Sequence, residues 1–463
     1  MTIATEAAHP STEHVVDRRL RPLHGAVFLQ ALVIWFAAEK LFLSEIGFTP
    51  AAIGLMAAVY AGVVPLVEFP SGILADRWSR RGVFAVACAS MAACSLVGGL
   101  SNGIGLYLVS AVLLGITLAL QSGTVDSMVY DLLVEQTGDG SDFIRRIGRV
   151  RLLEGLGLTA GALLGGLLSE AASPRMTYFA TIPPVLVALA LAFVFREPRL
   201  HRSEQRLSLG EQLSVTVRTI ADRGAVVPVL LLGAVAGVAV QLVFEFGPLW
   251  LVALAVPAVL FGPHWAALTG TLALGGVLAT LIPWHRTAAL VVLGVVMTGA
   301  SAATAVSHSL AALVAAQVVL LLALVTVGIH ASQRLHDAIP SHVRAGVASG
   351  AGTVVWLSFV PVALVFGWVA EALGVHRAGW LLTGLVAASA VILLRIAVAP
   401  PADTHPDEGL SCAEVVALAT AYADDEMPAG TAAAVGAHRH FCPGCDRYVG
   451  QVRELLRGLA SLR

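Results

Sequence analysis

The sequence predicts an all-α membrane protein: twelve transmembrane helices in two six-helix halves, followed by a small helical tail domain. Its composition is one reason, because 57% of the 463 residues are hydrophobic and only 13% are charged, whereas ordinary soluble domains carry about 25% charged residues. Apolar runs of about 20 residues recur along the chain and are long enough to cross a ~30 Å hydrocarbon core as helices. The arginines, finally, gather in alternate loops between these runs.

Each apolar run is expected to be a helix, because a helix satisfies its own backbone polar groups within lipid. The stretch 226–282 is the hardest to divide, because Pro248, Pro257 and Pro263 can each mark a turn. The expected spans are 23–46, 50–74, 82–99, 103–133, 146–169, 177–196, 226–248, 257–282, 286–305, 309–332, 345–371 and 376–397.

The basic residues orient these spans. The outer loops hold only Arg175 and Arg377, whereas the alternate loops, which are expected in the cytoplasm, hold most of the other arginines. This positive-inside bias predicts a multi-pass protein with both termini in the cytoplasm. The composition, with the single lysine Lys40 against many arginines and abundant alanine, glycine and valine, suggests a bacterial protein, so the expected location is the inner membrane. The arginines on which this orientation rests include Arg18, Arg19, Arg21, Arg77, Arg80, Arg81, Arg145, Arg146, Arg149, Arg151, Arg196, Arg199, Arg202, Arg206, Arg286, Arg334, Arg344 and Arg395.

The longest cytoplasmic loop divides the spans six and six. The predicted organisation is a cytoplasmic tail at 1–22, a first half at 23–196, a linker at 197–225, a second half at 226–397, a linker at 398–410 and a tail module at 411–463.

A short basic turn between spans 2 and 3 is the most informative motif. Residues 72–81 read GILADRWSRR. This pattern resembles the loop 2–3 signature of the major facilitator superfamily, with Ser79 where that family usually has glycine. The resemblance covers roughly residues 20 to 398. It implies a solute carrier whose site lies at the midplane between the two halves.

The resemblance also implies a set of gating contacts. Asp76 would cap the N-terminus of span 11 near residues 345–348, where an acid is favourable, and Arg80 would pair with Asp131 at the foot of span 4. These contacts would lock the outward-facing state. The alternative is a basic loop that only sets topology. The gating set is Gly72, Asp76, Arg77, Arg80, Arg81 and Asp131.

Polar and ionisable residues inside the spans are candidates for the substrate or proton pathway. In span 1, Glu39 and Lys40 are sequence neighbours and are expected not to pair, because adjacent helical residues point to different sides. Span 4 carries three polar residues on one face, span 7 carries two, and span 2 carries one acid. The full set is Glu39, Glu68, Ser122, Asp126, Tyr130, Gln241 and Glu245. Trp35, Trp250 and Trp356 either stack on a substrate or sit at the membrane interface.

Proton coupling requires a carboxyl group that gains and loses a proton in a desolvated place. The candidates, in order, are Asp126, Glu245 and Glu68. We therefore expect Asp126→Asn to abolish transport driven by a pH gradient. Since the spans carry few charges, the substrate is expected to be a small amphipathic or hydrophobic solute, and efflux is the favoured direction.

Span 5 reads GLTAGALLGGLL. It resembles the antiporter signature of the same superfamily at Gly161, Gly165 and Gly166, but Ala162 replaces the proline. Without proline a fixed kink is not expected. A glycine-rich helix contact is the other interpretation.

The tail has a different character. Cys412, His438, Cys442 and Cys445 include a His-x3-Cys-x2-Cys spacing, and three thiolates with one imidazole are a preferred structural zinc set. The segment resembles the zinc-binding module of zinc-containing anti-sigma factors. That resemblance implies one structural zinc ion and a cytoplasmic partner such as a sigma factor. An unmetallated polar tail is the alternative.

Two readings of function stay open at this point. One is a secondary active transporter with a regulatory tail, with no cofactor in its transport domain. The other is a membrane sensor that signals through the tail to a sigma factor or another transcription partner. An enzyme is not expected, because no phosphate-binding loop or nucleophile–base grouping is present, and direct nucleic-acid binding is not expected either.

Overall fold

The computed structural model describes the backbone of residues 12–77, 79–137, 142–198, 226–338, 344–398, 410, 412–424, 427–441 and 443–460. Some residues within these ranges are described by their backbone alone, among them 72–77, 344–349 and 412–413. The chain forms two compact units, Met1–Ile396 and Ala397–Arg463.

The first unit begins with a half made of eight helical segments. Two of the predicted spans are interrupted, one between α1 and α2 and one between α5 and α6. The two prolines inside α3, Pro65 and Pro70, do not end that helix. The segments are α1 (Thr12–Ala31), α2 (Glu39–Glu45), α3 (Pro50–Arg77), α4 (Arg80–Leu100), α5 (Ile104–Gln121), α6 (Thr124–Thr137), α7 (Phe143–Ala171) and α8 (Pro174–Val194).

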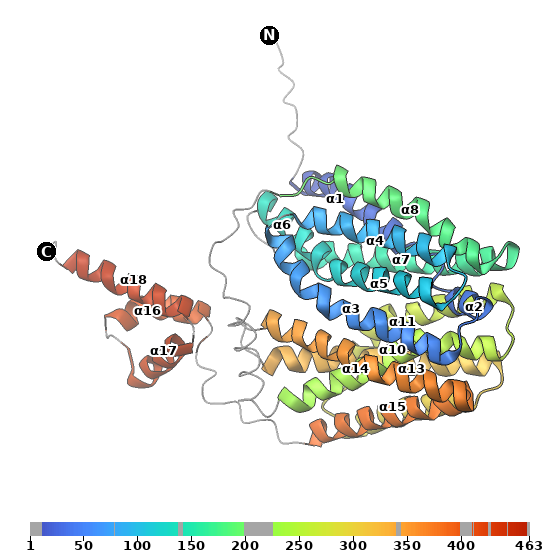
Figure 1. Cartoon of the computed structure of the whole chain (residues 1–463). Helices are drawn as coiled ribbons and strands as arrows, with labels where there is room; N and C mark the ends of the chain where they lie inside the picture. Colours follow the sequence, from blue (N-terminus) through green and yellow to red (C-terminus); the bar gives the residue numbers. More distant parts are fainter. Residues whose placement is uncertain are drawn as a thin grey trace, which may run out of the picture. The chain divides into compact units, whose positions relative to one another are not determined.

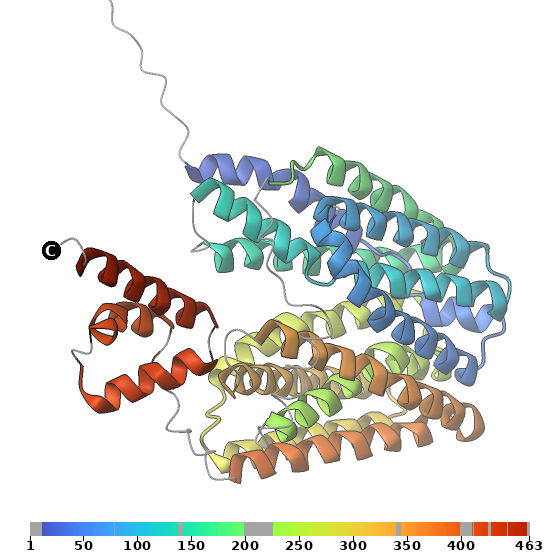
Figure 2. The ribbon, with the colours of Figure 1, turned by 60° about the vertical axis from the view of Figure 1, so that its left-hand side comes forward.

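The second half repeats the pattern, with each span formed by a single helix. In Figures 1 and 2, the helices up to α8 form one group and those from α10 to α15 form another. Its segments are α10 (Val226–Ala253), the short η1 (Ala258–Leu260), α11 (Phe261–Leu281), α12 (Thr287–Val306), α13 (Leu310–Ala338), α14 (Arg344–Leu373) and α15 (Val375–Val398).

Within the described residues, eleven helices are long and apolar enough to cross a membrane. They lie where the sequence predicts spans 2 to 12. The prediction of one continuous helix over 23–46 is wrong, because α1 ends at Ala31 and α2 starts at Glu39. The α5–α6 span also bends, at Gly123, whose φ of +67° lies in the left-handed region that glycine adopts without strain.

The helices run back and forth between two ends of the first unit. We call the end that holds Thr12 and Ile396 the terminal side. The opposite end, with the short loops 46–49, 101–103 and 254–257, is the loop side (Figure 1). The two halves meet along two helix pairs, α3 with α14 and α7 with α11. The candidate site lies between these two seams.

The second unit contains three helices, α16 (Cys412–Ala423), α17 (Ala429–Phe441) and α18 (Pro443–Ala460). Its small core consists of Val415, Ala419, Val435, Cys445 and Val449. So small a core favours an additional constraint such as a metal ion.

Candidate functional site

The site is organised by the break between α1 and α2. Neither glycine nor proline occurs in residues 32–38, so contacts with other helices must hold the unwound backbone. The Ile34 N–H donates to Thr181 Oγ1 at 3.0 Å, and the Trp35 indole N–H donates to Ser95 Oγ at 3.1 Å. These bonds satisfy polar groups that lipid could not.

A row of glycines on α7 packs against the same break. A Cβ atom added to Gly157 would come within 2.5 Å of the Phe28 carbonyl oxygen, and one added to Gly165 would lie 2.1 Å from the Ile34 carbonyl oxygen. At Gly161 the added atom would lie 3.0 Å from the backbone of Val33. The unwound segment therefore packs closely against this glycine row, which agrees with the helix-contact interpretation of span 5.

We expect Gly165→Ala to destabilise the protein by about 1–3 kcal/mol, because its methyl group would displace the Ile34 carbonyl. The thermal midpoint of the detergent-solubilised protein measures this effect. Gly155→Ala is the matched control in the same helix, since an added Cβ there meets no atom within 4 Å. An unchanged midpoint in Gly165→Ala would show that the break does not rest on this glycine.

The break delivers Glu39 and Lys40 into a buried ion cluster. Lys40 Nζ donates to Glu39 Oε2 at 2.5 Å and also to Glu245 Oε1. Glu39 and Lys40 belong to the first half, whereas Glu245 belongs to α10 of the second half. The ammonium group of Lys40 thus links the two halves at a place where its side chain is 3% exposed.

The expectation that Glu39 and Lys40 do not pair is wrong. It assumed an unbroken helix, but Glu39 is the first residue after the break. The Lys40 side chain contacts both acids, because a buried charge is stable only with partners.

Two phenols complete the cluster. The Tyr60 hydroxyl donates to Glu245 Oε2 at 2.6 Å, and the Tyr107 hydroxyl donates to Glu39 Oε1 at 2.7 Å. Each carboxylate therefore receives the ammonium group on one oxygen and a phenol on the other. The sequence analysis missed both tyrosines, although a hydroxyl inside an apolar run is a detectable signal.

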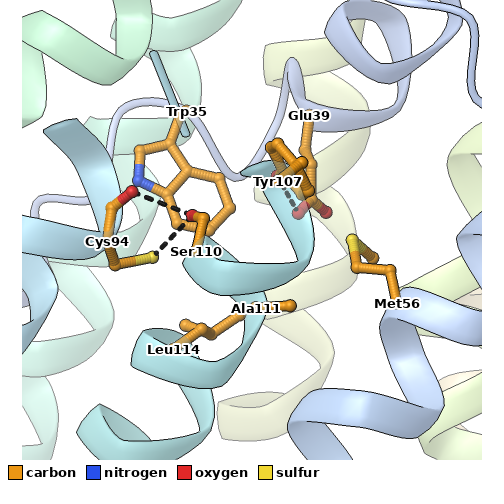
Figure 3. Close-up of a pocket in the computed structure, with 8 residues that line it drawn as sticks. All are labelled: Trp35, Glu39, Met56, Cys94, Tyr107, Ser110, Ala111 and Leu114. Atoms are coloured by element: carbon orange, nitrogen blue, oxygen red, sulfur yellow. Dashed lines mark hydrogen bonds between the residues drawn. The ribbon is translucent and has the colours of Figure 1, made fainter. Parts of the chain in front are cut away.

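Aromatic rings surround the cluster on the loop side. Trp35 stacks on Tyr178 with ring centroids 4.9 Å apart and planes 7° from parallel. Figure 3 shows Trp35, Glu39 and Tyr107 around a small hollow, with Ser110 hydrogen-bonded to Cys94. This hollow has no room for a water molecule beside Glu39.

The loop-side ends of both seams are closed. Gly54 on α3 lies against Gly367 on α14, and Gly166 on α7 lies against Gly262 on α11. An acid spans each seam. Glu371 Oε2 accepts from the Ala51 N–H at 3.0 Å, and Glu170 Oε2 accepts from the Val259 N–H at 3.2 Å. The two halves are thus tightly joined on the loop side.

A second polar group lies nearer the terminal side of the first half. Ser122 donates to Glu68 Oε1 at 2.6 Å. Asp126 accepts two hydrogen bonds from the Arg151 guanidinium, at 2.7 and 2.8 Å. Ser122 and Tyr130 are exposed and Asp126 is partly exposed. That this stripe faces the central cavity stays a prediction.

The basic loop is described in part. Arg80 forms an ion pair with Asp131, the contact that the family resemblance implied, and Arg81 donates to the Phe195 carbonyl at 3.3 Å. The side chains of Gly72, Asp76 and Arg77 lie outside the described residues, so the contact of Asp76 with span 11 stays a prediction. Gating by these residues also stays a prediction.

Ser79 and Glu197 were not recognised from sequence as a pair. The Ser79 side chain accepts from the Gly82 N–H at 3.0 Å, which caps α4, and its hydroxyl donates to Glu197. Glu197 also accepts from the Arg80 N–H at 2.7 Å. Serine in place of the usual family glycine therefore ties the α4 start to the end of α8.

The remaining candidates take less central positions. Gln241 is partly buried, one turn before Glu245. Trp35 and Trp250 are each 1% exposed, so neither sits at a membrane interface. Trp356 is partly buried and packs edge-on against Tyr60 at 6.2 Å.

In the tail, the predicted zinc ligands are only partly visible. Cys445 is 5% exposed within the small core, and His438 is partly buried near the end of α17. The side chain of Cys412 and the whole of Cys442 lie outside the described residues. Among the side chains that the structure places, no three His, Cys, Asp or Glu residues form a metal-binding group.

The family follows from comparison with known proteins. The profile described as "Major Facilitator Superfamily" matches residues 23–356, well over half of the chain. The chain belongs to the Major Facilitator Superfamily. No curated protein matches the sequence.

Solved structures of transporters share this Major Facilitator Superfamily fold. The nucleoside transporter NupG is 12% identical with a TM-score of 0.69, over 83% of this chain and 100% of that chain. The bacterial homolog to the human lysosomal transporter Spinster, in an inward-facing and unoccupied conformation, is 15% identical with a TM-score of 0.67, over 84% and 98%. The D-xylose-proton symporter is 14% identical with a TM-score of 0.59, over 82% and 96%.

Membership of this superfamily and these neighbours indicate a transporter rather than an enzyme. They are consistent with a multi-pass protein that handles a small molecule within the lipid bilayer.

Proposed function

We propose that the protein is a secondary active transporter that exports a small solute across the bacterial inner membrane in exchange for protons. We count the broken α1–α2 segment as a twelfth crossing, because it runs along α8. At one end the Arg19 guanidinium donates to the Arg196 carbonyl, and at the other end Trp35 stacks on Tyr178. The observation that carries the proposal is the buried ion pair between Lys40 and Glu245, which joins the two halves of a transporter fold.

The proposed orientation places the terminal side in the cytoplasm, because that side holds most of the arginines. With its loop side closed, the molecule is proposed to be in an inward-facing state. The Arg80–Asp131 pair, which the family resemblance implied would help lock the outward-facing state, lies within the first half and does not join the two halves. Switching must separate the halves on the loop side, and Glu245 would leave Lys40 and Tyr60. A carboxylate left without a partner in this buried place is costly, so a proton from outside is the natural replacement.

Glu245 therefore takes precedence over Asp126 as the proton-carrying group. Both oxygens of Asp126 accept from Nη2 of Arg151, which lies in the same half, so rocking of the halves does not need to break that pair. Glu245 has its partners in the opposite half.

Reconstitution tests this function. Full-length protein in liposomes with a trapped pH dye is exposed to a panel of toxic amphipathic compounds. We expect some of them to move protons across the membrane, in the direction opposite to the compound, and protein-free liposomes to show no such response. Binding without flux under either gradient, with co-purification of a sigma factor, would support the sensor instead.

The tail is proposed to hold one structural zinc ion through Cys412, His438, Cys442 and Cys445, and to regulate transport. Two features support this. Cys445 is buried in a core of only a few side chains. Val415, about one turn after Cys412 on α16, belongs to the same core, so the two ends of the ligand set converge there. When bound, zinc would stabilise the fold of the tail.

We expect full-length protein purified without chelators to contain about one zinc ion per chain by elemental analysis. Cys442→Ser should lose most of that zinc. Cys88→Ser, at a buried thiol of α4, should retain it. Equal zinc content in the two variants, or none in the unmodified protein, would reject the proposed site.

A further inference from the structure

The second half contains a hollow of about 170 Å³ that the ion cluster does not use. It lies between α10, α13 and α14 and is apolar apart from one hydroxyl, that of Ser332. An engineered apolar cavity of about 150 Å³ accommodates a benzene molecule, so this hollow has the size of one six-membered ring. Its lining includes Val229, Leu230, Gly328, Ala331, Gly352 and Val355.

The hollow has open space at two glycines. A Cβ atom added to Gly328 or Gly352 would meet no atom within 4 Å. In a tightly packed helix bundle, glycines normally serve close approach between helices, as Gly54 and Gly367 do on the loop side. At these two positions the missing side chains instead leave room for another molecule.

The polar group of the first half lies at a matching depth. Asp126 is about 16 Å from the end of α6, and Gly328 is about 15 Å from the end of α13, at 1.5 Å per residue. Asp126, Arg151 and Glu154 have side-chain exposures of 37%, 55% and 40%. Charges exposed at this depth must face water rather than lipid, so a water-filled vestibule opens from the terminal side.

The register of α3 against α14 brings the two walls together. Gly54 contacts Gly367, and Tyr60 packs against Trp356, so the two helices run antiparallel. Both helices continue from these contacts toward the terminal side, so Glu68 on α3 and Gly352 on α14 lie on the terminal side of the same seam. The acid and the apolar hollow therefore border the same vestibule.

The vestibule wall carries an excess of negative charge. Three carboxylates, those of Glu68, Asp126 and Glu154, face one guanidinium, that of Arg151, which leaves two negative charges. Arg80 and Arg149, nearer the helix ends, are engaged by Asp131 and Asp17. The first-half wall thus attracts a cation, whereas the hollow opposite takes an apolar group; the exposed Arg334 of α13 lies on the side of the hollow, not on this wall.

We propose that the hollow binds the ring of an amphipathic organic cation, whose charged end lies against the Glu68–Asp126 wall. This inference rests on the proposed transport function and names its substrate class. One face supplies charge and the opposite face supplies apolar contact. A neutral or anionic molecule of the same shape would satisfy only one of them.

Binding to full-length protein in lipid nanodiscs tests the inference with three molecules of the same shape. These are 2-phenylethylamine (cation), 2-phenylethanol (neutral) and 3-phenylpropionate (anion). We expect the cation to bind about tenfold more tightly than the neutral molecule, and the anion not to bind. Equal affinity for the cation and the neutral molecule, or preferred binding of the anion, would overturn the proposal.

Variants locate the site. Gly352→Val and Gly328→Val each place a side chain in the hollow and should weaken binding of the amine about tenfold. Gly384→Val is the control, because its added Cβ also meets no atom within 4 Å but lies on α15, outside the hollow. Glu68→Gln should reduce the preference for the cation about fivefold while leaving binding of 2-phenylethanol unchanged. Unchanged amine affinity in both hollow variants would refute the site.

The binding assay is independent of flux. Binding of the amine with no transport of any compound would leave this site standing and reject the proposed function. Transport of another solute with no binding of the amine would reject this site and leave the proposed transport function standing.

Discussion

Replacement of Lys40 by methionine is expected to destabilise the protein by about 3–5 kcal/mol. The ammonium group is 3% exposed and holds two carboxylates, those of Glu39 and Glu245. Methionine keeps the length and apolar character of the side chain but leaves two buried carboxylates facing each other. Removal of one partner from a buried ion cluster costs far more than the cluster contributes as a whole. The thermal midpoint of the detergent-solubilised protein should fall accordingly.

Two comparisons separate this effect from a general loss of charge. Arg145→Met removes a cation that is 65% exposed and lies 3.9 Å from Asp142, so its cost should stay within about 1 kcal/mol. The double variant Lys40→Met with Glu245→Gln removes one unpaired carboxylate and should recover much of the lost stability. If Lys40→Met were no worse than Arg145→Met, the cluster would not join the two halves in the way described above.

Most of the fold was predictable because lipid imposes a simple rule on composition. Runs such as 82–99 and 376–397 must be helices, and α4 and α15 start and end within two residues of those limits. The same rule explains the failure at 23–46. Apolar residues fill 32–38 whether the chain is helical there or not, and the break depends on Gly165, Thr181 and Ser95, which are remote in sequence.

The site was predictable as a set of residues but not as an arrangement. Glu39 and Glu245 can be selected from the sequence, because an acid inside an apolar span is costly and is therefore expected to have a function. No local sequence pattern indicates that Lys40 lies between the two acids. Glu245 is about 200 residues away from Glu39 and Lys40 along the chain, and the contact exists only when the two halves meet. Tyr60 and Tyr107 became part of the site only through their hydrogen bonds to these acids.

Glu245→Gln is expected to abolish transport driven by a pH gradient while the protein stays folded. The amide resembles the protonated acid, so Lys40 keeps one full partner, Glu39, and the buried charges balance. The variant should therefore be much more stable than Lys40→Met. It should also switch without a proton, because no carboxylate is left unpaired when the halves separate on the loop side. Flux driven by the pH gradient should fall about 100-fold or more, the factor that corresponds to 3–5 kcal/mol.

The measurement compares two kinds of flux in the same liposomes. Exchange of labelled for unlabelled substrate needs no net proton movement and should persist in Glu245→Gln, whereas accumulation against a concentration gradient should cease. Glu135→Gln is the control and should retain both, because it changes a carboxylate whose ion-pair partner, Arg19, lies in the same half. Asp126→Asn separates the two candidate acids, because Asp126 has its arginine partner in its own half. Accumulation lost in Asp126→Asn but intact in Glu245→Gln would assign the proton to the vestibule wall, and the Lys40–Glu245 pair would then be a lock without a coupling role.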